Sequence, residues 1–255
     1  MRTVLLCIIL FRSPLSAQES NTFGINEKIG GQIPMELTFV GEEGDIVTLK
    51  SLVQKPTILS LVYYKCPGIC SPLLDGMVEV LDRVGLEPET DFSVLTISID
   101  PSEGPELAKG KKRNYLHSMQ RQFPSAGWRF LTGSRENIEA LTSAVGFVYK
   151  KEGREFRHPA SLILLCPDGT ISRYMYGTTY LPLDLELAIR KANKGETSST
   201  IAKVLQYCFT DDPKGRIQAY KVLSMGGAFI TGMGLCLLTA MLIRRKNGNL
   251  PKKES

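Results

Sequence analysis

Two cysteines four residues apart are the residues of this chain best suited to chemistry. Cys66 and Cys70 follow an apolar segment at 57–62 that is typical of a buried strand, and a Pro-Gly pair stands between them where a helix is expected to begin. Thiols near a helix N-terminus lie close to unpaired N–H groups and to the positive end of the helix dipole, which favours the thiolate. A thiolate is both a nucleophile and a ligand for soft metals, so the pair predicts redox chemistry or metal binding. Packing of two small side chains beneath a loop is the structural alternative.

The spacing of the two cysteines is compatible with either chemistry. Residues i and i+4 of a helix share one face, so both sulfurs could point at one ion. The same pair could close a disulfide if the turn relaxes. A metal site built from this pair would therefore bind its ion only when the cysteines are reduced.

Histidine occurs only twice in the chain, at His117 and His158. His117 stands among lysines and arginines of an expected helix at 105–119, a pattern typical of a solvated face. His158 precedes an expected strand at 162–166, and loops at strand ends converge on ligands in α/β proteins. This position permits a ligand role for His158 but does not require one.

The segments around these residues must position them, and they alternate between strand and helix patterns. About 200 residues between the chain ends are enough for one α/β domain, and the alternation predicts a mostly parallel sheet. An early arm at 31–52 is expected to pair as a β-hairpin around a turn at 41–45. The expected strands are 57–62, 92–99, 129–131, 162–166 and 170–176, and the expected helices are 71–84, 105–119, 135–145 and 183–191.

The two ends of the chain predict export and a membrane anchor. Residues 1–17 have the order of a secretory signal, and 222–243 is an uncharged stretch long enough to span a bilayer as a helix. The tail at 244–255 is basic, and basic flanks stay in the cytoplasm. The expected organisation is a signal peptide, an exported domain at 18–193, a linker and membrane-proximal segment at 194–221, the span and the tail. This topology favours a bacterial inner membrane, with the domain facing the periplasm.

The net charge of +5 does not indicate a nucleic-acid-binding protein. The tail after residue 243 holds much of this charge, so the exported part is close to neutral. It contains no run in which arginines and aromatic residues alternate. We therefore expect no nucleic acid partner.

Two further cysteines fall in the exported part. Cys166 ends an apolar strand pattern and is expected to be a buried structural thiol. Cys208 lies in the membrane-proximal segment. It is a candidate for a free thiol, an intermolecular partner or a third redox participant.

Four motifs give the chain a resemblance to the SCO/SenC family of copper chaperones. They cover roughly residues 28–187 in the family's order: Cys66-Pro-Gly-Ile-Cys70, Leu-Thr-Ile-Ser-Ile-Asp-Pro at 95–101, Leu-Thr-Gly-Ser-Arg-Glu at 131–136, and His158 ahead of Cys-Pro-Asp-Gly at 166–169. The resemblance implies a thioredoxin-like fold with a central mixed sheet flanked by helices. It also implies that Cys66, Cys70 and His158 bind a copper ion, as Cu(I), Cu(II) or both. Thiolates suit Cu(I), imidazole suits both oxidation states, and three ligands leave a position open for transfer.

The chain departs from the family pattern at three places. Acidic residues usually follow the Asp100-Pro101 pair closely, and here only Glu103 could replace that charge. Pro159 stands after the histidine, where a small polar residue is usual. Many relatives are tethered at the N-terminus, whereas the expected span here is C-terminal, as in a bacterial subset that residues 208–216 loosely resemble.

The resemblance implies a metallochaperone that delivers copper to, or prepares, the copper site of cytochrome c oxidase subunit II. Upstream copper donors or thiol reductases are its further expected partners. Two other functions stay open from the residues. One is a thiol-disulfide oxidoreductase in which Cys66 attacks and Cys70 resolves, which needs no histidine ligand. The other is a redox or copper sensor that transfers no metal.

Overall fold

The computed structural model describes residues 23–66, 70–153 and 155–198. They contain a seven-stranded sheet, in which β4, β5 and β6 pair in parallel and all pairs beyond them are antiparallel. In spatial order its strands are β11 (Ile171–Tyr176), β10 (Ser161–Leu165), β4 (Thr57–Val62), β5 (Ser93–Ser98), β6 (Trp128–Thr132), β2 (Thr38–Gly41) and β3 (Ile46–Thr48). The expected α/β fold with a mixed sheet is confirmed. A mostly parallel sheet is wrong, because the hairpins β2–β3 and β10–β11 add antiparallel strands on both sides.

The centre of the sheet is apolar on both faces. All six residues of β4 are buried, as are five of the six in β5. A strand covered on both faces reads as a continuous apolar run, which is why β4 could be recognised in the sequence. Among the few polar side chains of these two strands, Ser60 and Thr96 hydrogen-bond to each other through their hydroxyl groups at 2.8 Å.

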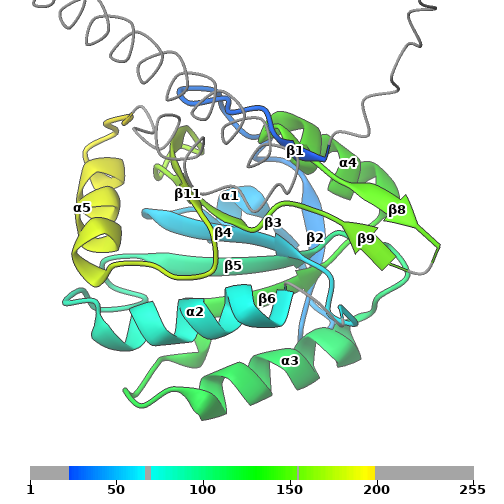
Figure 1. Cartoon of the computed structure of the whole chain (residues 1–255), viewed down its shortest axis with the longest axis horizontal. Coiled ribbons are helices and arrows are strands. Elements are labelled where there is room, and N and C mark those ends of the chain that lie inside the picture. Colours follow the sequence, from blue (N-terminus) through cyan, green and yellow to red (C-terminus); the bar gives the residue numbers. More distant parts are fainter. Residues whose placement is uncertain (1–22, 67–69, 154, 199–255) are drawn as a thin grey trace, which may run out of the picture. The chain divides into compact units, whose positions relative to one another are not determined.

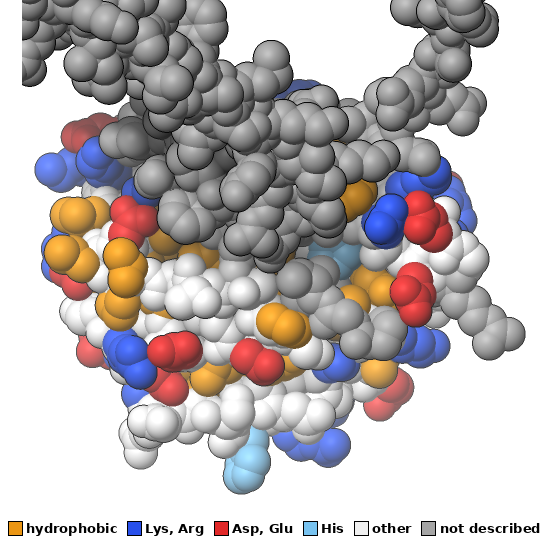
Figure 2. Space-filling view, viewed as in Figure 1, with side chains coloured by type: hydrophobic (Ala, Val, Ile, Leu, Met, Phe, Trp, Pro, Cys, Tyr) orange, Lys and Arg blue, Asp and Glu red, His pale blue; other side chains and the backbone are white. Residues whose placement is uncertain are grey.

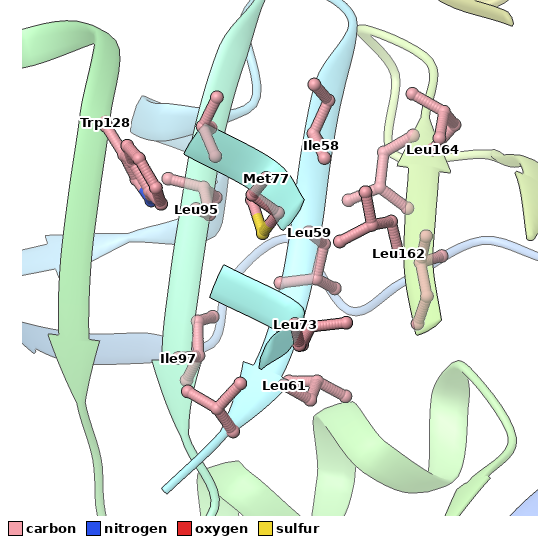
Figure 3. Packing of buried hydrophobic residues seen from close by; sticks show 14 of the residues in the cluster. Ile58, Leu59, Leu61, Leu73, Met77, Leu95, Ile97, Trp128, Leu162 and Leu164 are labelled. Atoms are coloured by element: carbon pink, nitrogen blue, oxygen red, sulfur yellow. The ribbon is translucent and has the colours of Figure 1, made fainter. Parts of the chain in front are cut away.

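Helices cover both sides of the sheet (Figure 1). On one side, α2 (Cys70–Arg83) packs between α3 (Pro105–Ser118) and α5 (Pro182–Asn193), and α4 (Arg135–Ala144) lies on the other. Figure 3 shows Leu73 and Met77 of α2 directed at the leucines of β4 and β5. The short helix α1 (Leu49–Leu52) follows β3. The expected helices agree with these bounds to within two residues.

Several small elements were not expected from the sequence. A two-stranded hairpin joins β8 (Lys150–Glu152) to β9 (Glu155–Arg157), and β1 (Gly24–Ile25) pairs with β7 (Phe147–Val148). A 3-10 turn, η1 (Ser125–Gly127), precedes β6. The hairpin strands are mostly charged and exposed, so they lack the alternation of apolar residues that reveals a strand.

A buried ion cluster ties β2, α3 and β6 together. The carboxylate of Glu42, which follows β2, accepts hydrogen bonds from Lys112 of α3, from Arg129 of β6 and from the backbone of Phe130. Arg129 also pairs with the carboxylate of Asp45 at 2.9 Å. Burial alone would raise the pKa of Glu42, but the hydrogen bond from Lys112 and the two positive charges outweigh it and hold this pKa below its ordinary value.

The surface of the described domain carries both signs of charge. Figure 2 shows acidic and basic side chains interspersed over α2 and α3, with hydrophobic side chains gathered over α5. Leu181, Leu183 and Leu187 are the exposed apolar residues of that helix region.

No helix within the described ranges is long and apolar enough to cross a membrane. The expected signal at 1–17, the expected span at 222–243, the tail at 244–255 and Cys208 all lie outside those ranges. Most of the segment at 194–221 does so as well.

Candidate metal centre

Three loops meet at one edge of the sheet because of the strand directions. The loops after β4 and β5 leave from the same edge, since these strands are parallel. β10 runs antiparallel to β4, and Leu162 pairs with Ser60, so the beginning of β10 lies beside the end of β4. The segment that carries His158 and the segment that carries Cys66 are thereby brought together from 92 positions apart.

The first cysteine lies at the end of a tight turn. The backbone N–H of Cys66 donates to the carbonyl oxygen of Tyr63 at 3.2 Å, which closes a four-residue turn directly after β4. Cys66 is partly exposed and packs against the core on its inner side. A partly exposed thiol between a buried strand and a helix N-terminus is open to a metal or to a reaction partner.

The second cysteine is the first residue of α2. The expectation that a helix begins at the cysteine pair is confirmed. The expectation that both cysteines lie on one face of this helix is wrong, because Cys66 precedes the helix and belongs to the turn. The side chain of Cys70 lies outside the described residues. Among the side chains that are described, no three His, Cys, Asp or Glu residues cluster as metal ligands do, so the three-ligand site stays a prediction.

The imidazole of His158 is enclosed by aromatic rings. Only 5% of the residue is exposed, and its ring is stacked on Phe147 with 6.0 Å between the centroids. The ring of Tyr63 meets it in a T-shaped contact with 5.9 Å between the centroids, and Phe156 of β9 makes a similar contact with Tyr63 at 5.3 Å. The histidine therefore contacts the first residue of the turn that ends at Cys66.

The hydrogen bond of His158 determines which ring nitrogen can bind a metal. Its Nδ1 lies 3.0 Å from the carbonyl oxygen of Pro159, and a carbonyl can only accept, so Nδ1 is the donor. The neutral ring then carries its lone pair on Nε2. Burial lowers the pKa of His158, an effect that the bond to Pro159 partly opposes, so the ring is neutral at pH 7. A neutral imidazole with one nitrogen held by a carbonyl is the usual state of a histidine ligand.

Tyr64 fixes the turn from inside the protein. Its ring is 2% exposed, and its hydroxyl lies 3.0 Å from the carbonyl oxygen of Thr96 and 2.8 Å from that of Leu131. Tyr63 and Tyr64 are neighbours at the start of this turn, directly after β4. The structure separates their roles, because Tyr63 contacts His158 and Tyr64 anchors the turn in the core.

The expectations that His117 is solvated and that Cys166 is a buried thiol are confirmed. His117 is exposed near the end of α3. Cys166 is buried, with 1% exposure, directly after β10. Burial raises the pKa of the Cys166 thiol, and nearby Asp168 adds to this shift, so the residue has the properties of a structural thiol.

The sequence was compared with models of known families, and the SCO1/SenC model matches residues 27–191. The chain belongs to the SCO1/SenC family. A SCO1 protein homolog of Bacillus subtilis (strain 168) is 30% identical over 152 residues, which are 58% of this chain and 75% of that protein. The region that the family model matches, residues 27–191, contains Cys66, Cys70 and His158.

Solved structures of similar proteins agree with the SCO1/SenC assignment. A putative electron transfer protein from Aquifex aeolicus VF5 is 30% identical, covers 66% of this chain and 95% of its own length, and has a TM-score of 0.60. The copper-bound ScoI of Arabidopsis thaliana is 23% identical, covers 66% of this chain and 99% of its own length, and has a TM-score of 0.52. Members of the family have thus been crystallised with copper, and the fold implied by the resemblance is confirmed.

Proposed function

We propose that this chain is an exported, membrane-anchored copper-binding protein that delivers copper to, or prepares, the copper site of cytochrome c oxidase subunit II. Cys66 and Cys70 supply thiolates and His158 supplies an imidazole. Family membership supports the copper chemistry, since the SCO1/SenC model covers both cysteines and the histidine. The oxidase target rests on the family resemblance alone.

The contact between His158 and Tyr63 is the observation that carries the proposal. It brings a neutral imidazole to the turn of a partly exposed cysteine, although the two residues are far apart in sequence. A disulfide exchange site has no need of a histidine held in one tautomer. A metal ligand does need it, because the coordinating nitrogen must be deprotonated and aimed.

The chemistry of these donors suits a transfer protein. Sulfur and nitrogen ligands select copper over hard cations such as magnesium and calcium. Since thiolates are the ligands, oxidation of Cys66 and Cys70 to a disulfide would abolish binding. The redox state of the pair would therefore control copper loading.

The second candidate is a thiol-disulfide oxidoreductase that reduces the cysteines of the same target. The partial exposure of Cys66 ahead of α2 favours this reading, because an attacking thiolate must be accessible. In this reaction the Cys66 thiolate attacks a target disulfide, forms a mixed disulfide with one target cysteine and releases the other as a thiolate. Cys70 then displaces the reduced target and leaves a Cys66–Cys70 disulfide, which a thiol reductase must reduce again.

Replacement of His158 separates the two candidates. We expect His158→Ala to lose copper retention in the reduced full chain while keeping its dithiol reductase activity. His117→Ala is the matched control and should keep both. Unchanged copper affinity in His158→Ala would refute the ligand assignment and would favour the oxidoreductase, which needs no histidine ligand.

The topology is tested by truncation. A chain that ends at Lys221 lacks the uncharged stretch at 222–243, so we expect it in the soluble exported fraction, whereas the full chain should resist alkaline extraction from membranes. A full chain that alkali extracts as readily as the truncated one would contradict the anchor.

A further inference from the structure

The turn that presents Cys66 is held by a carboxylate from another loop. Its two central residues, Tyr64 and Lys65, direct their backbone N–H groups at Glu103. The N–H of Tyr64 donates to Oε2 at 2.7 Å, and that of Lys65 donates to Oε1 at 2.8 Å. One carboxylate thus binds both central amides of the turn, with one oxygen for each.

The surroundings of Glu103 keep this carboxylate in place. The residue is only 5% exposed, and the hydroxyl of Ser98, at the end of β5, donates to Oε2 at 2.6 Å. The N–H of Glu103 itself closes a turn onto the carbonyl oxygen of Asp100 at 3.1 Å. Asp100 in turn accepts from the backbone and the hydroxyl of Ser102 at 2.9 and 2.7 Å. The loop after β5 is therefore a rigid support.

A buried carboxylate is costly unless several donors satisfy it. Here three donors do, and hydrogen bonds to a charged acceptor are about twice as strong as neutral ones. Two of the three come from the turn after β4, directly ahead of Cys66. The arrangement therefore couples the loop after β5 to the position of that cysteine.

We propose that Glu103 is a positioning residue for the site. Its carboxylate holds the Cys66 turn in the geometry that binds copper. It acts through the backbone of Tyr64 and Lys65 and binds no metal itself. The copper part of this inference rests on the proposed function, whereas the positioning of Cys66 does not. The same anchor would hold the thiol in either of the two candidate reactions.

Replacement of Glu103 by glutamine tests the proposal. The amide of glutamine puts an NH₂ group where one turn N–H needs an acceptor, so donor faces donor. We expect Glu103→Gln to weaken copper binding by about 10- to 100-fold, the usual effect of losing an outer hydrogen bond to a metal site. The Cu(II)–thiolate charge-transfer band should also shift. Glu103→Asp keeps the charge and both oxygens and should restore part of the affinity and of the band.

Glu106→Gln is the matched control, because Glu106 is an exposed residue of α3 with the same charge. It should bind copper as the unmodified chain does. Equal affinity and an unchanged band in Glu103→Gln and Glu106→Gln would overturn the proposal. So would a Glu103→Asp variant no better than Glu103→Gln when both are folded.

Two measurements need no metal. In the unmodified chain, hydrogen exchange at the amides of Tyr64 and Lys65 should be slow, and exchange as fast as in an unprotected peptide would overturn the proposal even if Glu103→Gln fails to fold. In folded Glu103→Gln, both amides should exchange faster and the alkylation rate of Cys66 should change. If the unmodified chain binds no copper but these effects appear, the proposed function fails and the positioning role stands.

Discussion

The centroid of the Tyr63 ring lies 5.9 Å from that of the His158 imidazole, and the planes of the two rings meet at 81°. Tyr63 begins the turn that ends at Cys66, and His158 precedes β10. This contact joins the two parts of the candidate site through a single ring. It also makes the orientation of the imidazole dependent on a residue that is no ligand.

The first prediction concerns this contact. Tyr63→Ala removes a buried ring that contacts both His158 and Phe156, so we expect the free energy of unfolding to fall by about 3–5 kcal/mol. Copper affinity should fall further than in Tyr63→Phe, which keeps the ring. Chemical denaturation and copper titration of the two variants check this. Equal copper affinities in two folded variants would show that the ring does not orient His158.

The second prediction concerns the ion cluster of Glu42. Glu42→Gln leaves the buried ammonium of Lys112 without its carboxylate, so we expect a loss of about 3–5 kcal/mol in the free energy of unfolding. Glu43→Gln is the matched control, because Glu43 pairs with Lys109 at the exposed surface, and it should change stability little. Chemical denaturation at pH 7 compares the two variants. Equal losses of unfolding free energy would show that burial does not make the Glu42 pair more important than the exposed Glu43 pair.

The same cluster predicts how stability depends on acid. The pKa of Glu42 is lower in the folded chain than in the unfolded chain. Its contribution is therefore fully present above the unfolded pKa, near 4.5, and is lost as the pH falls through the folded pKa. The stability difference between the unmodified chain and Glu42→Gln should thus shrink below about pH 4.5. A constant difference over this range would contradict the shift.

The third prediction concerns two glycines in helices. A Cβ at Gly76 of α2 would overlap the carbonyl oxygen of Thr178, whereas a Cβ at Gly110 of α3 would meet nothing. We expect Gly76→Ala to lower the unfolding free energy by about 1–3 kcal/mol, despite the better helix propensity of alanine. Gly110→Ala should raise it by about 0.5–1 kcal/mol. Thermal denaturation measures both, and an unfolding free energy that Gly76→Ala leaves unchanged or raises would show that Gly76 is not required for close packing of α2.

Much of the fold could be predicted because its elements carry strong local patterns. The apolar run of β4 predicts a central strand, and the helix after it follows from the cysteine pair and the apolar residues of α2. The hairpin β8–β9 could not be predicted, since Lys150–Glu152 and Glu155–Arg157 are largely charged. The antiparallel sheet edges depend on how distant hairpins dock, which local pattern does not determine.

The sequence indicated which residues of the candidate site could carry its chemistry, but not the hydrogen bonds that hold the Cys66 turn in place. The spacing of Cys66 and Cys70 predicted redox chemistry or metal binding, and the resemblance to the SCO/SenC family implied His158 as the third ligand. Glu103 was recognised only as a charge that could replace a missing acidic residue. Its bonds to Tyr64 and Lys65 span 38 to 39 positions in the chain and involve backbone groups, which no side-chain pattern reveals.

X-ray absorption at the copper edge tests the central claim most directly. The reduced full chain, loaded with Cu(I), should bind one copper ion with two sulfur ligands and one nitrogen ligand. Cys66→Ala and Cys70→Ala should each lose one sulfur, and His158→Ala should lose the nitrogen. A site without sulfur ligands, a stoichiometry other than one, or spectra that these replacements leave unchanged would contradict the assignment of Cys66, Cys70 and His158 as the copper site.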